Sequence, residues 1–205
     1  MRQEINEWWE CKGDQTLREC YPLNEYSVIF DLGGFDGNFS QTMYSKYKSN
    51  IYVFEPHPEF VSIIRDKFKD NEKVKVFDYG VGGKTENLQL VSCNESSYII
   101  PQTKVNNTSN KIFQNISIKS FKNVYDEMKV NNIDLLKINV EGSEYDIMQN
   151  IFDNDLTTKI NNFQIQFHKI NDKSEKLLLD IRTELSKTHK QDWCFNWVWE
   201  NWSLK

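Results

Sequence analysis

The chain has 205 residues and carries 25 Lys and Arg against 30 Asp and Glu, which gives a formal net charge of −5. This length suits one ordinary domain, and 39% hydrophobic residues can build a core, so the composition excludes a disordered chain or a repeat array. A negative charge without a stripe of Lys and Arg also argues against a nucleic-acid partner, because phosphate binding needs concentrated positive charge.

The N-terminus resembles neither a signal peptide nor a membrane span. Its opening residues, MRQEINEWWECK, carry charges where a signal peptide needs an apolar stretch. No apolar run in the chain approaches the roughly 20 residues that cross a bilayer. We therefore expect a cytoplasmic protein with no membrane span.

The cysteines predict neither a metal site nor a disulfide framework. Cys11, Cys20, Cys93 and Cys194 form no C-x-x-C pair, and the three histidines offer no zinc-ligand spacing beside them. A chain of this length without an export signal does not need disulfides. We expect free thiols and no structural metal.

The first 26 residues do not share the pattern of the rest of the chain. They contain Trp8 and Trp9, which we expect on a helix that packs across the sheet or over the mouth of a ligand site. Simple packing is the favoured interpretation. Residues 1–26 are therefore predicted to be an N-terminal helical extension, followed by one domain over residues 27–205.

From residue 27 onward, short apolar runs alternate with longer amphipathic segments. This alternation is typical of βαβ units and predicts an α/β fold with a mostly parallel sheet. The predicted strands are Ser27–Leu32, Ile51–Glu55, Val74–Tyr79, Ile133–Val140, Phe163–His168 and Asp192–Trp199. The predicted helices are Asn38–Tyr47, Pro58–Lys69, Ser120–Lys129, Ser143–Phe152 and Lys173–Lys187.

Residues 84–119 interrupt this alternation with a stretch rich in Asn, Ser and Thr. Short strand-like pieces occur in it at Leu88–Val91, Tyr98–Ile100 and Ile112–Ile118. We expect an insertion over one edge of the sheet that carries substrate-facing loops.

The strongest local signal is the loop Asp31-Leu32-Gly33-Gly34-Phe35-Asp36-Gly37, directly after the first strand. Glycines let the backbone turn sharply and approach a ligand, and the following helix offers free N–H groups to a nucleotide-like group. The dinucleotide motif G-x-G-x-x-G would need glycine at position 32, where the chain has leucine, so NAD chemistry loses its main support. The loop reads D-x-G-x-x-x-G instead.

Two acids in this loop and one after it favour S-adenosylmethionine. Asp31 and Asp36 would repel a phosphate but attract a sulfonium or an amino group. Glu55 ends the second strand, 18 residues after Gly37. Doubly wound folds place at this point the acid that binds ribose hydroxyls.

Three blocks of the chain resemble the FkbM family of methyltransferases, with matching order and spacing over residues 27–168. They are the glycine loop, the segment FEPHP at residues 54–58 and the segment DLLKINVEGSE at residues 134–144. The resemblance implies a Rossmann-like, seven-stranded class I methyltransferase sheet with helices on both faces. It also implies that the protein binds S-adenosylmethionine and methylates a hydroxyl, often of a sugar or polyketide.

The expected cofactor-binding residues lie after the first three strands. They are Asp31, Gly33, Gly34, Phe35, Asp36, Gly37, Glu55, Pro56, Tyr79 and Gly80. A divalent metal is compatible with such a site, but no ligand spacing indicates one.

The chain departs from the family pattern at two positions. The family block usually reads K-I-D-x-E-G-x-E, whereas this chain has Asn139, and Gln166 stands where an acid often precedes the histidine by two residues. Asn139 is placed to orient an acceptor but cannot act as its base. Glu141 and His168 are the remaining candidates, and an imidazole is partly unprotonated at neutral pH.

These candidates also have structural interpretations. His168 is alternatively a hydrogen-bonded histidine at a strand end, and Glu141 a cap of the following helix. Lys137 lies inside an apolar strand, where it is expected to pair with Glu141 or Glu144.

The C-terminus is rich in tryptophan. Strand alternation would put four aromatic side chains on one face, where core packing is favoured over a platform for an acceptor. They are Trp193, Phe195, Trp197 and Trp199.

The leading prediction is an S-adenosylmethionine-dependent O-methyltransferase that acts on a small-molecule or glycan hydroxyl and not on nucleic acid. N-methylation is an alternative, because nucleic-acid amino-methyltransferases carry Asn or Asp at the position of Asn139. The segment Val140-Glu141-Gly142 lacks, however, the Pro-Pro-aromatic sequence that holds a flipped base. A methyltransferase-like binding module without catalysis is the third interpretation, since the two amides at 139 and 166 replace acids.

Overall fold

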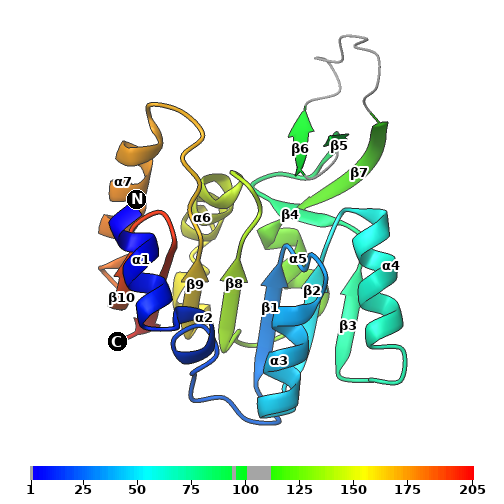
Figure 1. Ribbon diagram of the computed structural model, residues 1–205, viewed down its shortest axis with the longest axis horizontal. Coiled ribbons are helices and arrows are strands. Elements are labelled where there is room, and N and C mark those ends of the chain that lie inside the picture. The colour runs from blue at the N-terminus through cyan, green and yellow to red at the C-terminus, as the bar shows by residue number, and fades with distance from the viewer. Residues whose placement is uncertain (1, 94–95, 101–111) are drawn as a thin grey trace.

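The computed structural model describes residues 2–93, 96–100 and 112–205, which form two sheets flanked by helices. In Figure 1 the parallel strands of the large sheet run upward, and the small sheet lies above their carboxyl ends. The large sheet contains β1 (Val28–Leu32), β2 (Asn50–Phe54), β3 (Val74–Phe77), β8 (Leu135–Ile138), β9 (Asn162–Ile165), β10 (His189–Phe195) and β11 (Trp199–Leu204). The small sheet contains β4 (Gly80–Gly82), β5 (Glu86–Cys93), β6 (Ser96–Ile100) and β7 (Ile112–Ser120).

The helices of the described residues lie mostly between consecutive strands of the large sheet. They are α1 (Arg2–Glu10), α2 (Gly13–Thr16), α3 (Asn38–Tyr47), α4 (Pro58–Lys67), α5 (Phe121–Met128), α6 (Glu144–Asp153) and α7 (Ser174–Leu185), with a 3₁₀ turn at Thr157–Lys159. Each of the five predicted helices overlaps one of them.

The large sheet has the strand order β10-β11-β9-β8-β1-β2-β3. Strand β11 runs antiparallel to both of its neighbours, and the remaining pairs are parallel. The prediction of a seven-stranded, mostly parallel α/β sheet is therefore confirmed. The predicted strands between Ser27 and His168 in this sheet are also found, although β8 is shorter than the predicted Ile133–Val140.

Side chains that alternate along the strands fill both faces of the sheet. Ile29 of β1 packs with Met43 of α3 on one face. Its neighbour Phe30 joins the cluster that contains Ile147 of α6 on the other face. All four side chains are fully buried. Strands buried on both faces need apolar residues at nearly every position, which is why they are near-continuous apolar runs in the sequence.

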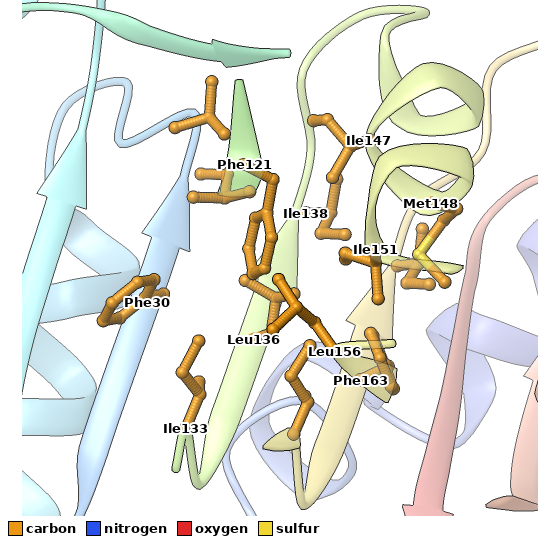
Figure 2. Packing of buried hydrophobic residues seen from close by; sticks show 14 of the residues in the cluster. Phe30, Phe121, Ile133, Leu136, Ile138, Ile147, Met148, Ile151, Leu156 and Phe163 are labelled. Atoms are coloured by element: carbon orange, nitrogen blue, oxygen red, sulfur yellow. The ribbon is translucent and has the colours of Figure 1, made fainter. Parts of the chain in front are cut away.

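Figure 2 shows the cluster between the sheet and α6. Leu136 and Ile138 of β8 lie on the side of the sheet that faces Ile147 and Ile151 of α6, and Phe121 joins them from the start of α5. Each of these side chains is fully buried, and burial of one such side chain contributes roughly 1.5–3 kcal/mol. This packing fixes the carboxyl end of β8, where the polar residues of the site begin.

The prediction of one closing strand over Asp192–Trp199 is wrong. The chain turns at residues 196–198 between β10 and β11, and the Phe195 carbonyl accepts the Val198 N–H at 2.8 Å. Trp197 lies in this turn with a φ of +62°. The four aromatic residues therefore do not share one strand face.

Trp8 of α1 occupies the place where Trp193 and Phe195 meet. Its ring centroid lies 5.8 Å from that of Trp193 and 5.2 Å from that of Phe195. Trp8 is 3% exposed, whereas Trp9 is 64% exposed. Of the two placements expected for this helix, packing against the sheet is the one observed.

The polar stretch at residues 84–119 pairs with β4 to form the small sheet, in the order β4-β7-β5-β6. It covers the carboxyl ends of the parallel strands instead of an edge strand (Figure 1). The predicted strand pieces are present as β5, β6 and β7, while residues 94–95 and 101–111 lie outside the described residues.

Candidate active site

A cavity of about 1220 Å³ opens at the carboxyl ends of β1, β2 and β8, next to the small sheet. The loops after these strands supply most of its wall. The expected cofactor residues that line it are Gly33, Gly34, Phe35, Asp36, Glu55, Pro56 and Gly80. The expected residues that do not line it are Asp31, Gly37 and Tyr79.

The glycines of the loop after β1 permit close backbone contacts. Gly33 has a φ of +84°, and a Cβ at this position would lie 1.9 Å from the carbonyl oxygen of Asn139. Gly37 has a φ of +75° and precedes the first residue of α3. Phe35 stands between them at the rim of the cavity, with its ring centroid 4.4 Å from that of Phe60.

Asp31 lies below this loop, in the core of the sheet. Its Oδ1 accepts a hydrogen bond from Lys137 Nζ at 2.8 Å, and its Oδ2 accepts one from Ser40 Oγ at 2.6 Å. The expected pairing of Lys137 with Glu141 or Glu144 is wrong, because the register of β1 and β8 sets Lys137 opposite Asp31. Lys137 thus balances the charge of Asp31. The expectation that Asp31 attracts a sulfonium is therefore not supported.

Lys137 also holds the glycine loop. Its Nζ donates to the carbonyl oxygen of Gly33 at 2.6 Å, and its side chain lines the floor of the cavity. One buried ammonium therefore joins β1, β8 and the loop between β1 and α3.

Glu55 follows β2 and is 6% exposed. Its Oε1 accepts the N–H of His57 at 2.8 Å, and its Oε2 accepts the N–H of Phe35 at 2.9 Å. Burial raises the pKa of Glu55, and this effect outweighs the two hydrogen bonds and the charge of Lys137, which lower it. Each carboxylate oxygen can accept a second hydrogen bond, so Glu55 keeps capacity to bind hydroxyls in the cavity.

Tyr79 belongs to the core. Its ring centroid lies 5.7 Å from that of Phe54, and Lys119 Nζ lies 4.3 Å from the same ring. Burial raises the pKa of Tyr79 to about 12. The next residue, Gly80, does line the cavity, and a Cβ there would lie 2.6 Å from Ile118 Cδ1.

Asn139 and Gln166 follow β8 and β9 and both line the cavity. The Oδ1 atom of Asn139 is buried and has no hydrogen-bond partner among the described residues. A buried acceptor without a partner costs about 1–3 kcal/mol. A ligand that donates a hydrogen bond to this oxygen would remove that cost.

His168 lies between two carboxylates behind the cavity wall. Its Nδ1 is hydrogen-bonded to Glu144, and its Nε2 lies 3.5 Å from Oε2 of Glu141. Burial lowers the pKa of His168, but the hydrogen bond to Glu144 and the charges of both carboxylates outweigh it, so the pKa is raised. Glu141 lines the cavity, whereas His168 does not. No hydrogen bond joins Glu141 to the first turn of α6 in the described part of the chain, so its role as a helix cap is not supported.

Residues close to the two ends of the chain complete the wall, and the sequence motifs did not indicate them. The guanidinium carbon of Arg18 lies 4.0 Å from the ring centroid of Trp199, and its Nη1 donates to Oδ1 of Asp14 at 2.7 Å. All three residues line the cavity. Of these three residues, only Trp199 had a signal in the sequence, as one of the four aromatic residues of the tryptophan-rich C-terminus, and the other three of those four do not line the cavity.

Among the charged residues in the described lining of the cavity, acids outnumber bases. The Asp and Glu residues are Asp14, Glu19, Asp36, Glu55, Glu59, Glu86, Glu141 and Asp146. The Lys and Arg residues are Arg18, Lys84 and Lys137, and Lys137 is already paired with Asp31. Such a surface favours neutral or cationic ligands over polyanions.

The described residues contain no group of three His, Cys, Asp or Glu side chains that could hold a metal ion. Within the same residues, no helix has both the length and the apolar character needed to cross a membrane.

The sheet order, the glycine loop after β1 and the acid after β2 together define a Rossmann-like class I methyltransferase. A family model described as "Methyltransferase FkbM domain" matches residues 31–192, and the chain belongs to this family. S-adenosylmethionine is the cofactor that this membership implies. The residues present fit it, since Gly33, Gly34 and Glu55 line the cavity and Glu55 offers acceptors to ribose hydroxyls.

The comparisons with individual proteins agree with this class. The chain is 28% identical over 92 residues to "Probable ribosomal RNA small subunit methyltransferase A" of Methanococcoides burtonii. That match covers 45% of this chain, which spans only about a third of the relative's length (32%).

Three solved structures share the fold at low sequence identity. A protein of Streptococcus mutans described as a methyltransferase, in complex with SAH, has a TM-score of 0.55 at 11% identity and covers 95% of this chain and 94% of its own. An rRNA methylase of Streptococcus thermophilus has a TM-score of 0.50 at 10% identity, with 89% of each chain covered. The SAH-bound methyltransferase of Podospora anserina has a TM-score of 0.50 at 11% identity, with 87% and 72% covered.

Proposed function

We propose that the protein is an S-adenosylmethionine-dependent O-methyltransferase that methylates a hydroxyl of a neutral sugar or glycan. The observation that carries this proposal is the acidic lining of the cavity, around a buried Asn139 Oδ1 that lacks a donor. A sugar hydroxyl supplies that donor and brings no negative charge into the cavity.

Glu55 and the glycine loop would hold the cofactor. Glu55 Oε1 and Oε2 are fixed by the N–H groups of His57 and Phe35, so they can accept ribose hydroxyls without reorganising. Gly33 and Gly34 line the cavity beside Glu55, and the absence of a Cβ at these positions lets the loop pack against Asn139 and Val53. S-adenosylmethionine, when bound, supplies an electrophilic methyl group.

The residues after β8 and β9 would serve the acceptor. Asn139 Oδ1 would accept a hydrogen bond from a second hydroxyl of the acceptor and would so orient the hydroxyl that is methylated. The hydroxyl that is methylated would give its proton to the pair formed by Glu141 and His168, while the cofactor, when bound, would supply the methyl group. Removal of the proton matters because an alcohol is a poor nucleophile while it is protonated.

A nucleic-acid acceptor is the second candidate, because the relatives above include ribosomal RNA methyltransferases. RNA would bring a row of phosphates to a cavity whose described acidic residues outnumber its basic ones. N-methylation is favoured by one feature only: Asn139 Oδ1 can accept a hydrogen bond from an amino group as well as from a hydroxyl. A binding module without catalysis remains the interpretation if no acceptor is methylated.

A transfer assay tests the proposal. We would incubate the protein with methyl-tritiated S-adenosylmethionine and a panel of neutral glycans, small alcohols, amines and RNA, with divalent metal either added or chelated. We expect label in a neutral glycan or alcohol. Label only in RNA or an amine would contradict the proposal, and no transfer despite cofactor binding would favour the binding module.

The His168→Ala variant tests the proton-accepting pair in the same assay. We expect a loss of roughly 100-fold or more in kcat, the size typical of general-base catalysis, with cofactor affinity retained. Unchanged turnover with intact cofactor binding would eliminate His168 as the base.

A further inference from the structure

Glu144 is a buried acid to which the proposed mechanism gives no role. It is the first residue of α6 and is fully buried, and its Oε1 is hydrogen-bonded to Nδ1 of His168. Its second oxygen, Oε2, is buried without a hydrogen-bond partner among the described residues. A carboxylate placed in this way is costly to bury unless its one partner compensates for it.

His168 is held at three points, two of them by α6. Tyr145, the residue after Glu144, donates from its hydroxyl to the carbonyl oxygen of His168 at 2.8 Å. Glu144 binds Nδ1, and Glu141 faces Nε2 at 3.5 Å from the turn before α6. Among the residues that the structure describes, the charged groups that face the imidazole are these two carboxylates. The backbone and one ring nitrogen are therefore fixed, while Nε2 faces the carboxylate of Glu141.

The carboxylates of Glu144 and Glu141 differ in their exposure to solvent, and this difference separates their roles. The Glu144 side chain is fully buried, whereas the Glu141 side chain is 69% exposed and lines the cavity. An ionised carboxylate can only accept hydrogen bonds, so the proton between Glu144 and His168 resides on Nδ1. In the neutral imidazole, Nε2 then carries the lone pair.

We propose that Glu144 is a positioning residue, which fixes His168 in the tautomer protonated at Nδ1 and thereby leaves Nε2 to receive the acceptor's proton on the Glu141 side. This inference rests on the proposed function, in which His168 belongs to the proton-accepting pair. When Nε2 takes the proton, the imidazolium lies between two carboxylates that stabilise its charge. The proton that arrives comes from the acceptor hydroxyl, and the Nδ1 proton stays in place.

Two variants separate the charge of Glu144 from its hydrogen bond. Glu144→Gln keeps an oxygen that accepts from Nδ1–H but removes the negative charge. Glu144→Ala removes both. Glu141→Gln is the matched control, because it neutralises the exposed carboxylate and leaves the Nδ1 bond intact.

Nitrogen-15 and proton NMR of the imidazole rings reads the tautomer and the pKa without any acceptor. The chain has only three histidines, His57, His168 and His189, so the signals can be assigned by substitution. We expect the Nδ1–H tautomer in the wild type and in Glu144→Gln, and a shift toward Nε2–H in Glu144→Ala. We also expect the pKa of His168 to fall in Glu144→Gln by more than in Glu141→Gln.

The transfer assay then tests the role. We expect kcat to fall roughly 100-fold or more in Glu144→Ala, with a smaller loss in Glu144→Gln and unchanged affinity for the cofactor in both. An Nε2–H tautomer in the wild type, or identical tautomer and kcat in Glu144→Ala, would overturn the positioning role. If the wild type methylates no acceptor, the proposed function fails, and the NMR result still decides whether Glu144 holds His168.

Discussion

Lys137 and Asp31 form a buried ion pair beneath the glycine loop, with Nζ and Oδ1 2.8 Å apart and side chains 5% and 0% exposed. They lie on neighbouring strands, β8 and β1, in direct register. The same ammonium donates to the carbonyl oxygen of Gly33. The pair therefore couples the stability of the sheet centre to the shape of the cavity.

Breaking this pair is expected to be strongly destabilising. Lys137→Met leaves the Asp31 carboxylate buried with Ser40 as its one remaining partner among the described residues. Loss of one member of a buried pair costs about 3–5 kcal/mol. Lys122→Met is the control, since Lys122 pairs with Asp126 at the surface and such pairs contribute roughly 0–1 kcal/mol. Urea denaturation measures both. Equal losses in the two variants would contradict the importance of the buried pair.

The adjacent residues Trp8 and Trp9 provide a second test, of the packing of α1. Trp8→Ala should lower the free energy of unfolding by about 3–5 kcal/mol, because it empties the space between Trp193 and Phe195. Trp9 is 64% exposed, so Trp9→Ala should change the free energy of unfolding by less than about 0.5 kcal/mol. Thermal or chemical denaturation compares the two, and a similar loss in both would show that α1 does not dock as described.

Most strands and helices could be predicted because each leaves a local trace. Parallel strands buried on both faces are continuous apolar runs, and the helices between them have an apolar face. The hairpin of β10 and β11 escaped prediction because the aromatic alternation continues through its turn, where Trp197 adopts a positive φ without a glycine. Alternation of aromatic and polar residues cannot reveal a turn in the chain when aromatic residues also occupy the turn.

The site was harder to predict because its contacts depend on strand register. Nothing near Lys137 in the sequence indicates Asp31 as its partner, since β8 lies beside β1 only in the folded sheet. The approach of Arg18 to Trp199 likewise brings together opposite ends of the chain. The position of Glu55 and of Gly33 to Asp36 at the cavity could be predicted because both follow a strand directly, and the carboxyl ends of parallel strands share one edge.

Gly33 should tolerate no side chain. In Gly33→Ala, the φ of +84° costs about 1–2 kcal/mol, and the new Cβ would overlap the carbonyl oxygen of Asn139. We expect a loss of stability above about 2 kcal/mol together with weaker cofactor binding. Ser143→Ala is the control, because Ser143 makes no side-chain cap to α6. A Gly33→Ala protein as stable as Ser143→Ala would disprove the tight contact.

The raised pKa of His168 predicts a defined pH dependence. Because the folded pKa exceeds the unfolded value near 6.5, the contribution of the charged histidine to stability is complete below about pH 6.5 and is lost as pH rises through the folded pKa. The difference in unfolding free energy between wild type and His168→Gln should thus be larger at pH 6 than at pH 9. Turnover should change in the opposite direction, rising as Nε2 loses its proton. A stability difference independent of pH would argue against the two carboxylate contacts.

We propose that the cavity beside the glycine loop is the cofactor site of this methyltransferase, with Glu55 as the ribose ligand. Titration calorimetry with S-adenosylmethionine tests it most directly in the wild type, Glu55→Gln and Glu59→Gln. We predict one binding site in the wild type, an affinity at least about 10-fold lower in Glu55→Gln, the equivalent of about 1.4 kcal/mol, and little change in Glu59→Gln. Equal affinity of Glu55→Gln and the wild type, or no binding by the wild type, would contradict the claim.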